Sequence, residues 1–415
     1  MRVLWFETSK PARYLGGHKQ LVVRGWQDAL EEIIRQHSEI ELFVAFESET
    51  DNEMKSIDGV TYVPVHTHYS FFEKKKQGFS WRVNEIKLVN ACVPIVNQIK
   101  PDLIHIFGNE WPYGLIAEYV NVPVVIHIQG SIIPYDNAYF PPGYNTYDLM
   151  RTAGLNLRRQ YHVIRERCSE KSRLEMEKHI WKVVDHYMGR TCWDKALVNV
   201  LHSTATYHHV EEALRPEFMK TTKRWKQKEN ARKVKIITTG CSSFWKGVDV
   251  ILKTAHVLKC NGIDFEWNVA GNLPMKIKNT VERKEKLKFS DNNIQVLGYI
   301  SPSELIDLLC DCTLYVHTAY IENSPNSICE AQYLGVPVVS TMVGGISSLI
   351  RNGQDGILLP ANDPWQIANA IIELSKDNDL QNQFSSNAYV FARKRHSPEN
   401  ILAQLLNCYR TLCKM

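Results

Sequence analysis

The sequence predicts an α/β protein built of two doubly wound domains that face a cleft. The chain of 415 residues is long enough for two or three domains. Its 44% hydrophobic and 23% charged residues are typical of a folded globular protein. Short apolar runs alternate with helix-compatible stretches in each half of the chain. This alternation indicates parallel sheets with helices on both faces.

Five short apolar runs in the first half are expected to form buried strands. They lie at residues 2–6, 40–46, 60–65, 103–107 and 122–128. Helices are expected between them, at residues 17–36, 81–100 and 111–120. These elements predict an N-terminal domain over residues 1–205.

The same alternation returns in the second half and predicts a C-terminal domain over residues 233–396. Its strands are expected at residues 235–239, 265–270, 294–297, 313–317 and 336–341. Its helices are expected at residues 248–260, 303–310, 327–334, 364–375 and 380–394, with a last helix at 398–413. Residues 206–232 between the domains are expected to form a linker. This linker is basic, because residues 220–235 contain eight Lys or Arg and one Glu.

Charge and cysteine content exclude several classes of protein. The net charge of +4 is low for a dedicated nucleic-acid binder, so nucleic acid is not an expected partner. No run of 18 apolar residues predicts a membrane span, and the N-terminus lacks the apolar core of a signal peptide. The ten cysteines include no Cys-x-x-Cys pair, and no histidine cluster completes a metal site. We expect reduced thiols in a cytoplasmic protein without a bound metal.

The most informative motif contains Glu322 and Glu330, eight positions apart. Glu322 lies on the loop after a predicted strand, and Glu330 lies in the first turn of the next predicted helix. Free backbone N–H groups at residues 326–328 would bind an anion at that helix N-terminus, and Glu330 could accept hydrogen bonds from a sugar diol. The alternative is structural. Ser327-x-x-Glu330 is also a capping-box sequence, and Glu322 would then be a solvated loop carboxylate.

The Glu-x7-Glu pattern, followed by Ala331 and by Gly-Val-Pro-Val-Val at 335–339, resembles the signature of retaining glycosyltransferases of GT-B architecture. The specific resemblance is to family 4, of the bacterial polysaccharide-biosynthesis type. It extends to a strand-end glycine followed by Lys-Gly at 240–247, and to Gly pairs at 16–17 and 344–345. It is strongest over residues 236–360 and implies two Rossmann-like domains, with the acceptor bound by the first and the nucleotide sugar by the second. It also implies that the helix in 397–415 packs back on the N-terminal domain.

The resemblance assigns roles in donor binding. Glu330 would bind the ribose hydroxyls, Glu322 the hydroxyls of the transferred sugar, and Lys246 the diphosphate leaving group, whose growing charge a fixed cation stabilises. Backbone amides at Asn326, Ser327 and Ile328 would hold the sugar or its phosphates. The other donor-binding candidates are Gly16, Gly17, Gly240, Ser242, Gly271, Tyr299 and Ile300. The Gly16-Gly17 pair would let the backbone approach a ligand, and it lacks the Gly-x-Gly-x-x-Gly spacing of a dinucleotide site.

Two positions depart from the family pattern. Cys241 stands where the family usually has an Arg. Ser242 or Ser243 could donate a hydrogen bond there, and Arg190 of the other domain is the expected substitute for the missing charge. Gln129 stands where the family often has a His, with His127 two residues earlier on the same face of the strand. Gln129 can hydrogen-bond a sugar but cannot act as a base. Gln129 and His127 are counted with Lys246 and Glu322 as catalytic candidates. The resemblance implies that the leaving phosphate takes the proton of the acceptor hydroxyl.

The acceptor side and the basic segments complete the prediction. Acceptor-side candidates are His18, Glu110, Arg190 and Asp194. The aromatic-rich loop at 135–147 would stack on an acceptor sugar, form a lid or pack on the surface. Residues 151–182 carry nine Lys or Arg against four Asp or Glu. They predict a basic amphipathic surface that docks on anionic lipid or, alternatively, the solvated face of an ordinary helix.

We therefore predict a metal-independent, retaining glycosyltransferase. It would move a hexose-type sugar from a UDP- or GDP-sugar to a hydroxyl of a glycan or lipid-linked acceptor, with no other cofactor. The expected location is the cytoplasm, with peripheral contact to the inner face of the membrane. The alternatives are a nucleotide-sugar epimerase of the same architecture and a non-catalytic nucleotide-sugar-binding protein.

Overall fold

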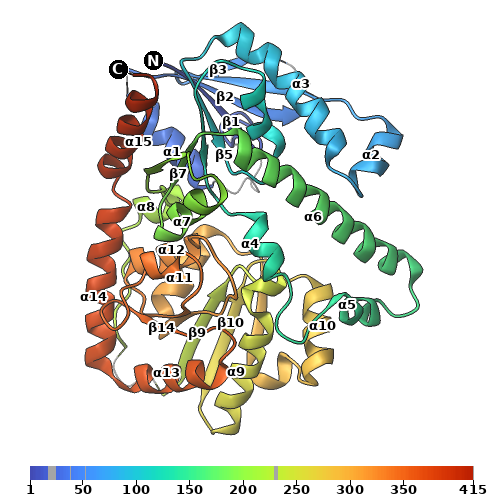
Figure 1. The fold of residues 1–415 in the computed structure, drawn as a ribbon. Coiled ribbons are helices and arrows are strands. Elements are labelled where there is room, and N and C mark those ends of the chain that lie inside the picture. Colours follow the sequence, from blue (N-terminus) through green and yellow to red (C-terminus); the bar gives the residue numbers. More distant parts are fainter. Residues whose placement is uncertain (17–24, 38, 52, 229–231, 415) are drawn as a thin grey trace. The chain divides into compact units, whose positions relative to one another are not determined.

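The computed structural model describes residues 1–16, 25–37, 39–51, 53–228 and 232–414. The chain divides into two compact units. Unit 1 contains residues 1–133, 164–216 and 396–415, and unit 2 contains residues 134–163 and 217–395. Each unit is built around one sheet (Figure 1).

The sheet of unit 1 has eight strands in the order β3-β4-β2-β1-β5-β6-β7-β8. All neighbours are parallel except β3 and β4. Strand order reverses between β1 and β5, and the loops after these strands lie where open α/β sheets bind ligands. The strands are β1 (Arg2–Glu7), β2 (Glu41–Ser48), β3 (Lys55–Ile57), β4 (Val60–His66), β5 (Leu103–Phe107), β6 (Val124–His127), β7 (His186–Gly189) and β8 (Thr206–His209).

Helices surround this sheet, and the last one comes from the end of the chain. They are α1 (Trp26–Ile34), α2 (Phe71–Gln77), α3 (Arg82–Ile99), the 3₁₀ helix η1 (Pro112–Glu118), α7 (Cys192–Leu201) and α15 (Pro398–Leu412). In α15 the buried hydroxyl of Tyr409 accepts a hydrogen bond from Nε1 of Trp5 at 2.9 Å and lies 2.7 Å from Nδ1 of His105. These contacts attach the C-terminal helix to the centre of the sheet of unit 1.

The sheet of unit 2 has six strands, all parallel, in the order β11-β10-β9-β12-β13-β14. They are β9 (Val234–Thr239), β10 (Phe265–Ala270), β11 (Ile294–Gly298), β12 (Leu314–His317), β13 (Val338–Thr341) and β14 (Ile357–Leu359). The longer helices are α5 (Thr146–Ala153), α9 (Val248–Cys260), α10 (Met275–Glu285), α11 (Pro302–Asp311), α12 (Asn326–Leu334), α13 (Pro364–Lys376) and α14 (Asn378–Arg395). The strand order reverses between β9 and β12, which is the switch point of this sheet.

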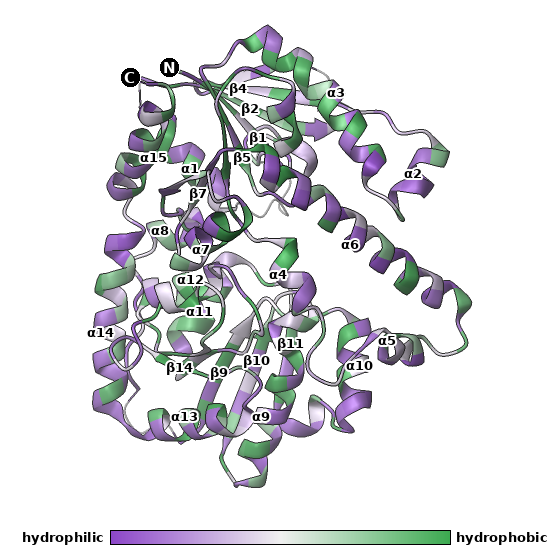
Figure 2. Ribbon diagram, viewed as in Figure 1, coloured by the Kyte–Doolittle hydropathy of each residue, from purple (hydrophilic) through white to green (hydrophobic). Residues whose placement is uncertain are grey.

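Three helices, two short and one long, cross the boundaries between the two units. The helix α4 (Ile132–Asn137) leaves unit 1, and α8 (Pro216–Lys220) enters unit 2. The 27-residue helix α6 (Leu157–Val183) begins in unit 2 and ends in unit 1. Figure 2 shows hydrophilic and hydrophobic residues interspersed along its whole length. In the part of the chain that the structure describes, no helix combines the length and apolarity needed to cross a bilayer.

The predicted two-domain α/β fold is correct, but some predicted boundaries are wrong. Residues 134–163 belong to unit 2 rather than to the N-terminal domain. The predicted linker begins with β8, which pairs with β7. Both strands carry polar residues such as His186 and His208 and lack an apolar run, so no strand was predicted at either position. The predicted helix at 111–120 is the 3₁₀ helix η1, and that at 17–36 begins at Trp26 within the described residues.

Candidate functional site

The candidate site lies at the carboxyl ends of β9 and β12 in unit 2. These parallel strands are neighbours, with Tyr315 opposite Ile237, so the loops that follow them emerge at one edge of the sheet. The loop after β9 carries Lys246, and the loop after β12 carries Glu322 and leads into α12. This is the strand-order switch point, where open α/β sheets bind their ligands.

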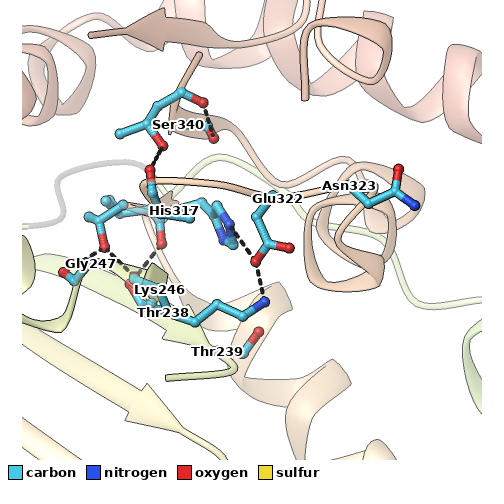
Figure 3. Close-up of polar contacts among 12 residues, drawn as sticks. Thr238, Thr239, Lys246, Gly247, His317, Glu322, Asn323 and Ser340 are labelled. Carbon is cyan, nitrogen blue, oxygen red and sulfur yellow. Dashed lines mark hydrogen bonds and ion pairs between the residues drawn. The ribbon is translucent and has the colours of Figure 1, made fainter. Parts of the chain in front are cut away.

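Lys246 and Glu322 form an ion pair at this edge (Figure 3). The Glu322 carboxylate is buried, and Nε2 of His317 lies 3.5 Å from the same oxygen, Oε1. Burial opposes ionisation of Glu322, but Lys246 and His317 outweigh it and hold its pKa at about 2. Glu322 is therefore a buried carboxylate that stays ionised at neutral pH, beside a partly exposed ammonium group.

Glycines hold the backbones of both residues in place. Gly247 has φ +71°, and a Cβ there would lie 1.9 Å from the carbonyl oxygen of Thr318. The Thr318 hydroxyl donates to the carbonyls of Lys246 and Gly247 at 3.1 and 3.0 Å. On the other side, a Cβ at Gly344 would lie 1.8 Å from the carbonyl oxygen of Glu322. Only residues without a side chain allow these loops to approach so closely.

Glu330 is buried on α12, and the structure excludes the capping-box alternative. The N-cap of α12 is Pro325 and its first residue is Asn326, so Glu330 lies in the second turn and Ser327 is not a cap. The amide of Ile328 donates to the carbonyl of Pro325 at 3.0 Å. It is therefore engaged within the chain rather than available to an anion, contrary to the prediction for that residue.

Three strand-ending glycines shape the rest of this edge. Gly240, Gly271 and Gly298 follow or end β9, β10 and β11, and all have positive φ. The N–H of Gly271 donates to the carbonyl of Gly298 at 2.7 Å, and that of Gly240 to Ala270 at 3.3 Å. The predicted donor-binding residues Ser242, Tyr299 and Ile300 follow these turns, and Tyr299 is exposed.

Cys241 lies in the hydrophobic core of unit 2, next to the turn at Gly240. Burial raises the pKa of its thiol to about 12, so it is neutral. The position where the resemblance expects an Arg therefore faces inward and cannot offer a charge to a ligand.

Tyr135 belongs to the aromatic loop predicted at 135–147, but its contact with the candidate donor site was not predicted. Its hydroxyl accepts a hydrogen bond from the backbone N–H of Asn323 at 3.2 Å, and its ring stacks on Trp245 with centroids 5.6 Å apart. Trp245 precedes Lys246, and Asn323 follows Glu322. Tyr139 and Phe140 pack on Trp245 and Phe244 beside it. The aromatic loop is therefore a packed part of unit 2, the third of the predicted alternatives.

Unit 1 brings two predicted residues together at the ends of β5 and β6. A Cβ at Gly108 would lie 2.5 Å from Oε2 of Glu110 and 3.8 Å from Cδ of Gln129, so both side chains lie over this glycine. Nearby on α6, buried Glu177 accepts hydrogen bonds from Nδ2 of Asn109 and from the N–H of Ile133. Burial, reinforced by the charge of Glu110, raises the pKa of Glu177 to about 7. Glu177 was not predicted as a site residue, because nothing in the sequence distinguishes it from the other three acids of a basic helix.

The other candidates in unit 1 are buried or lie outside the described residues. His127 is fully buried, and burial lowers its pKa to about 3. Arg190 is buried in an ion pair with Glu212. Asp194 caps α7, where it accepts hydrogen bonds from the amides of Arg190 and Thr191, both at 3.0 Å. The predicted substitution of Arg190 for the missing charge at Cys241 finds no support in this geometry. Gly16 ends a described segment, whereas Gly17 and His18 lie outside the described residues.

Among the described residues, no three His, Cys, Asp or Glu side chains gather in an arrangement that could hold a metal ion. The polar groups at the edge of unit 2 instead suit a ligand with hydroxyls and negative charge, because an ammonium, an ionised carboxylate and a helix N-terminus converge there.

The candidate site of unit 2 lies in a stretch of the chain that matches a known family model. Residues 219–391 match the family model of glycosyl transferases group 1. Over 170 residues the chain is 25% identical to the capsular polysaccharide biosynthesis glycosyltransferase CapM of Staphylococcus aureus, with 41% of this chain and 44% of that protein covered. The chain thus spans about two fifths of the length of the curated relatives it matches.

Solved structures show the same fold over the whole chain. A sucrose-phosphate synthase of Thermosynechococcus elongatus aligns with a TM-score of 0.71 and 14% identity, covering 99% of both chains. Anabaena HepE, in complex with UDP-glucose, aligns with a TM-score of 0.64 and 15% identity, covering 99% of this chain and 100% of that one. The chain therefore has the GT-B fold of these proteins, and its residues 219–391 match the model of glycosyl transferases group 1.

Proposed function

We propose that the protein is a retaining glycosyltransferase that moves a sugar from a nucleotide-diphosphate sugar to a hydroxyl of a glycan or lipid-linked acceptor. The observation that carries this proposal is the Lys246–Glu322 pair at the carboxyl ends of β9 and β12. We propose a UDP- or GDP-sugar as donor, with UDP favoured because Anabaena HepE binds UDP-glucose. The reaction needs no metal and no further cofactor in this proposal.

The proposed chemistry assigns charge stabilisation to Lys246. When the sugar–phosphate bond breaks, negative charge grows on the leaving diphosphate, and the fixed ammonium of Lys246 lowers the free energy of that state. Glu322 is ionised because Lys246 and His317 hold its pKa at about 2, so it can accept hydrogen bonds from hydroxyls of the sugar. Glu330 would accept hydrogen bonds from the ribose diol.

The acceptor hydroxyl would lose its proton to the leaving phosphate in this proposal. Gln129 has no basic atom. His127 is fully buried and its pKa of about 3 makes it a weak base, so neither is suited to take the proton. Glu110 and Gln129, which lie together over Gly108, are the acceptor-side groups that the geometry favours. Their role is to orient the hydroxyl, which by itself accelerates transfer between bound reactants.

The first experiment identifies the nucleotide. UDP, GDP, ADP and CMP are titrated against the protein, and the thermal unfolding midpoint is measured. Stabilisation by one nucleoside diphosphate alone names the donor class, since a ligand that binds only the folded state raises stability in proportion to the logarithm of its concentration over Kd. Stabilisation by none of them would contradict the proposal.

The second experiment separates the roles of two residues. We expect Glu330→Ala to weaken the binding of UDP and of UMP equally, because both nucleotides contain the ribose. We expect Lys246→Met to weaken the binding of UDP but not of UMP, because the ammonium would contact the second phosphate. The same variant should reduce turnover by about 100-fold or more. Lys226→Met, at an exposed basic residue of unit 2, is the matched control. Wild-type turnover in both Glu330→Ala and Lys246→Met would show that the assigned site is wrong.

The same preparations test the alternative functions. An epimerase would convert the nucleotide sugar with no acceptor present, and a binding protein would bind nucleotide without turnover against any acceptor. We further propose a cytoplasmic location with peripheral contact to an anionic membrane, which would bring a lipid-linked acceptor to unit 1. The basic segments at 151–182 and 220–235 are its predicted basis.

A further inference from the structure

The basic segment at 220–235 is partly paired with carboxylates within unit 2. Lys223 pairs with Asp307, and Lys228 and Lys235 both pair with Asp311. The Arg224 guanidinium lies 4.3 Å from the ring centroid of Tyr389. With the Lys233–Glu266 pair, three carboxylates serve four of the eight cations of this segment, so its charge is partly compensated. Exposed pairs of this kind contribute little stability, but they make the segment a weaker candidate for an anionic partner than a basic surface without carboxylates.

Some cations in the carboxyl-terminal part of α6 also have carboxylate partners. Arg167 pairs with Glu170 at 2.8 Å, and Lys178 pairs with Glu175 at 2.7 Å. The Arg173 guanidinium lies 4.8 Å from the ring centroid of Trp81, and burial lowers its pKa. Arg167 and Lys178 therefore have carboxylate partners, and Arg173 packs on an aromatic ring of unit 1.

A different situation holds at the corner between α5 and α6, which we define as residues 149–165. This corner contains four arginines (Arg151, Arg158, Arg159 and Arg165) and no carboxylate. Arg158 and Arg159 are exposed, and neither forms an ion pair in the described part of the chain. The positive charge of the corner is therefore concentrated and largely uncompensated.

Apolar side chains are exposed at the same corner. Leu155 is 98% exposed and Leu157 78%, and further along α6 Tyr161 is 50% and Ile164 46% exposed. Residues 157, 161 and 164 have the i, i+4, i+7 spacing that places side chains on one helix face. Val163, by contrast, is buried and belongs to the core of unit 2. An exposed apolar stripe thus runs beside the exposed Arg158 and Arg159.

We propose that the α5–α6 corner docks on an anionic lipid surface. Apolar side chains of an amphipathic helix enter the boundary between headgroups and acyl chains, and flanking arginines bind the acidic headgroups. Symmetric pairing with a second copy is disfavoured, because it would bring the four arginines of each chain together. This proposal deepens the membrane contact of the proposed function by assigning its surface, and it holds whether or not the chain transfers sugar.

The test is co-sedimentation of the full chain with two kinds of vesicle. One is phosphatidylcholine alone, and the other contains about 30% phosphatidylglycerol as the anionic lipid. We expect binding to the anionic vesicles only. Arg158→Gln/Arg159→Gln should reduce the partition coefficient by about 30-fold, and Leu155→Ser/Leu157→Ser by about tenfold or more. Lys223→Gln/Lys228→Gln removes two charges from the paired basic segment and should bind as wild type.

Other outcomes overturn the proposal. These are equal binding to neutral vesicles, no binding of the wild type, or a loss in Lys223→Gln/Lys228→Gln as large as that in the corner variants. A wild-type dimer that Leu155→Ser/Leu157→Ser converts to a monomer would assign the corner to a second copy. UDP-induced thermal stabilisation, measured on each variant, shows that it is folded. It also separates failure of the membrane proposal from failure of the donor-site proposal.

Discussion

The hydroxyl of Tyr135 accepts a hydrogen bond from the backbone N–H of Asn323, 188 positions later in the chain. The ring of the same tyrosine stacks on Trp245 at an interplanar angle of 19°. Tyr135 thus contacts the residue before Lys246 and the residue after Glu322. A residue from the first third of the sequence supports both loops of the candidate donor site.

We predict that Tyr135→Phe weakens donor binding by about fivefold, since one hydrogen bond contributes about 1 kcal/mol. Tyr135→Ala also loses the stack on Trp245 and should weaken it further. The measurement is the Kd of the identified nucleoside diphosphate by calorimetry. Tyr147→Phe, at an exposed tyrosine of the same segment, is the control. Wild-type affinity in Tyr135→Phe would mean that the hydroxyl does not position the loop after β12.

Gly247 should tolerate no side chain. It has φ +71°, and a Cβ there would lie 1.9 Å from the backbone oxygen of Thr318. Gly353 has a similar φ of +74° but no atom within 4 Å of its Cβ position. Gly353→Ala should therefore lower the free energy of unfolding by only about 1 kcal/mol, because of its left-handed backbone. Gly247→Ala should lower it considerably more. Equal losses of unfolding free energy in urea would show that the Thr318 contact relaxes without cost.

Glu177 should make stability fall as the pH rises. Burial raises its pKa from 4.5 to about 7. Between these two values the folded state holds a proton that the unfolded state has released. Its contribution to stability is therefore complete below pH 4.5 and is lost as the pH rises through 7. The decline in unfolding free energy from pH 5 to pH 8 should be shallower in Glu177→Gln by about 2 kcal/mol.

The control for this slope is Glu175→Gln, which alters a carboxylate that is 72% exposed on the same helix. Its unfolding free energy should follow the wild type at each pH. A slope in Glu177→Gln as steep as that of the wild type would assign the pH dependence to other groups, of which Glu110 is the nearest candidate because burial also raises its pKa.

Cys241→Arg, the change that would restore the charge of the family pattern, should destabilise unit 2 rather than improve catalysis. The thiol is buried among apolar side chains, and a guanidinium there would be an unpaired buried charge. We expect a loss of at least about 3 kcal/mol, seen as a lower unfolding midpoint. Cys241→Ala should fold and bind nucleotide. A stable Cys241→Arg with tighter diphosphate binding would show that the side chain can turn outward.

The sequence alone was sufficient for the features that depend on local pattern. Apolar runs with period and spacing typical of buried strands predicted both central sheets, and Val248–Cys260 was predicted as a helix with the bounds observed in α9. The Glu322–Glu330 spacing after a predicted strand indicated the edge at which Lys246 and Glu322 meet. These signals lie within short stretches of chain, where propensity and periodicity determine structure.

Only the tertiary structure decided what depends on distant contacts. It assigned residues 134–163 to unit 2, directed Cys241 into the core and Arg190 to Glu212, and raised the pKa of Glu177 by burial. It also distinguished the exposed arginines of the α5–α6 corner from the paired cations that follow them in sequence. Burial and partner choice are properties of the folded chain, because residues far apart in sequence create the environment that sets a side chain's charge, exposure and role.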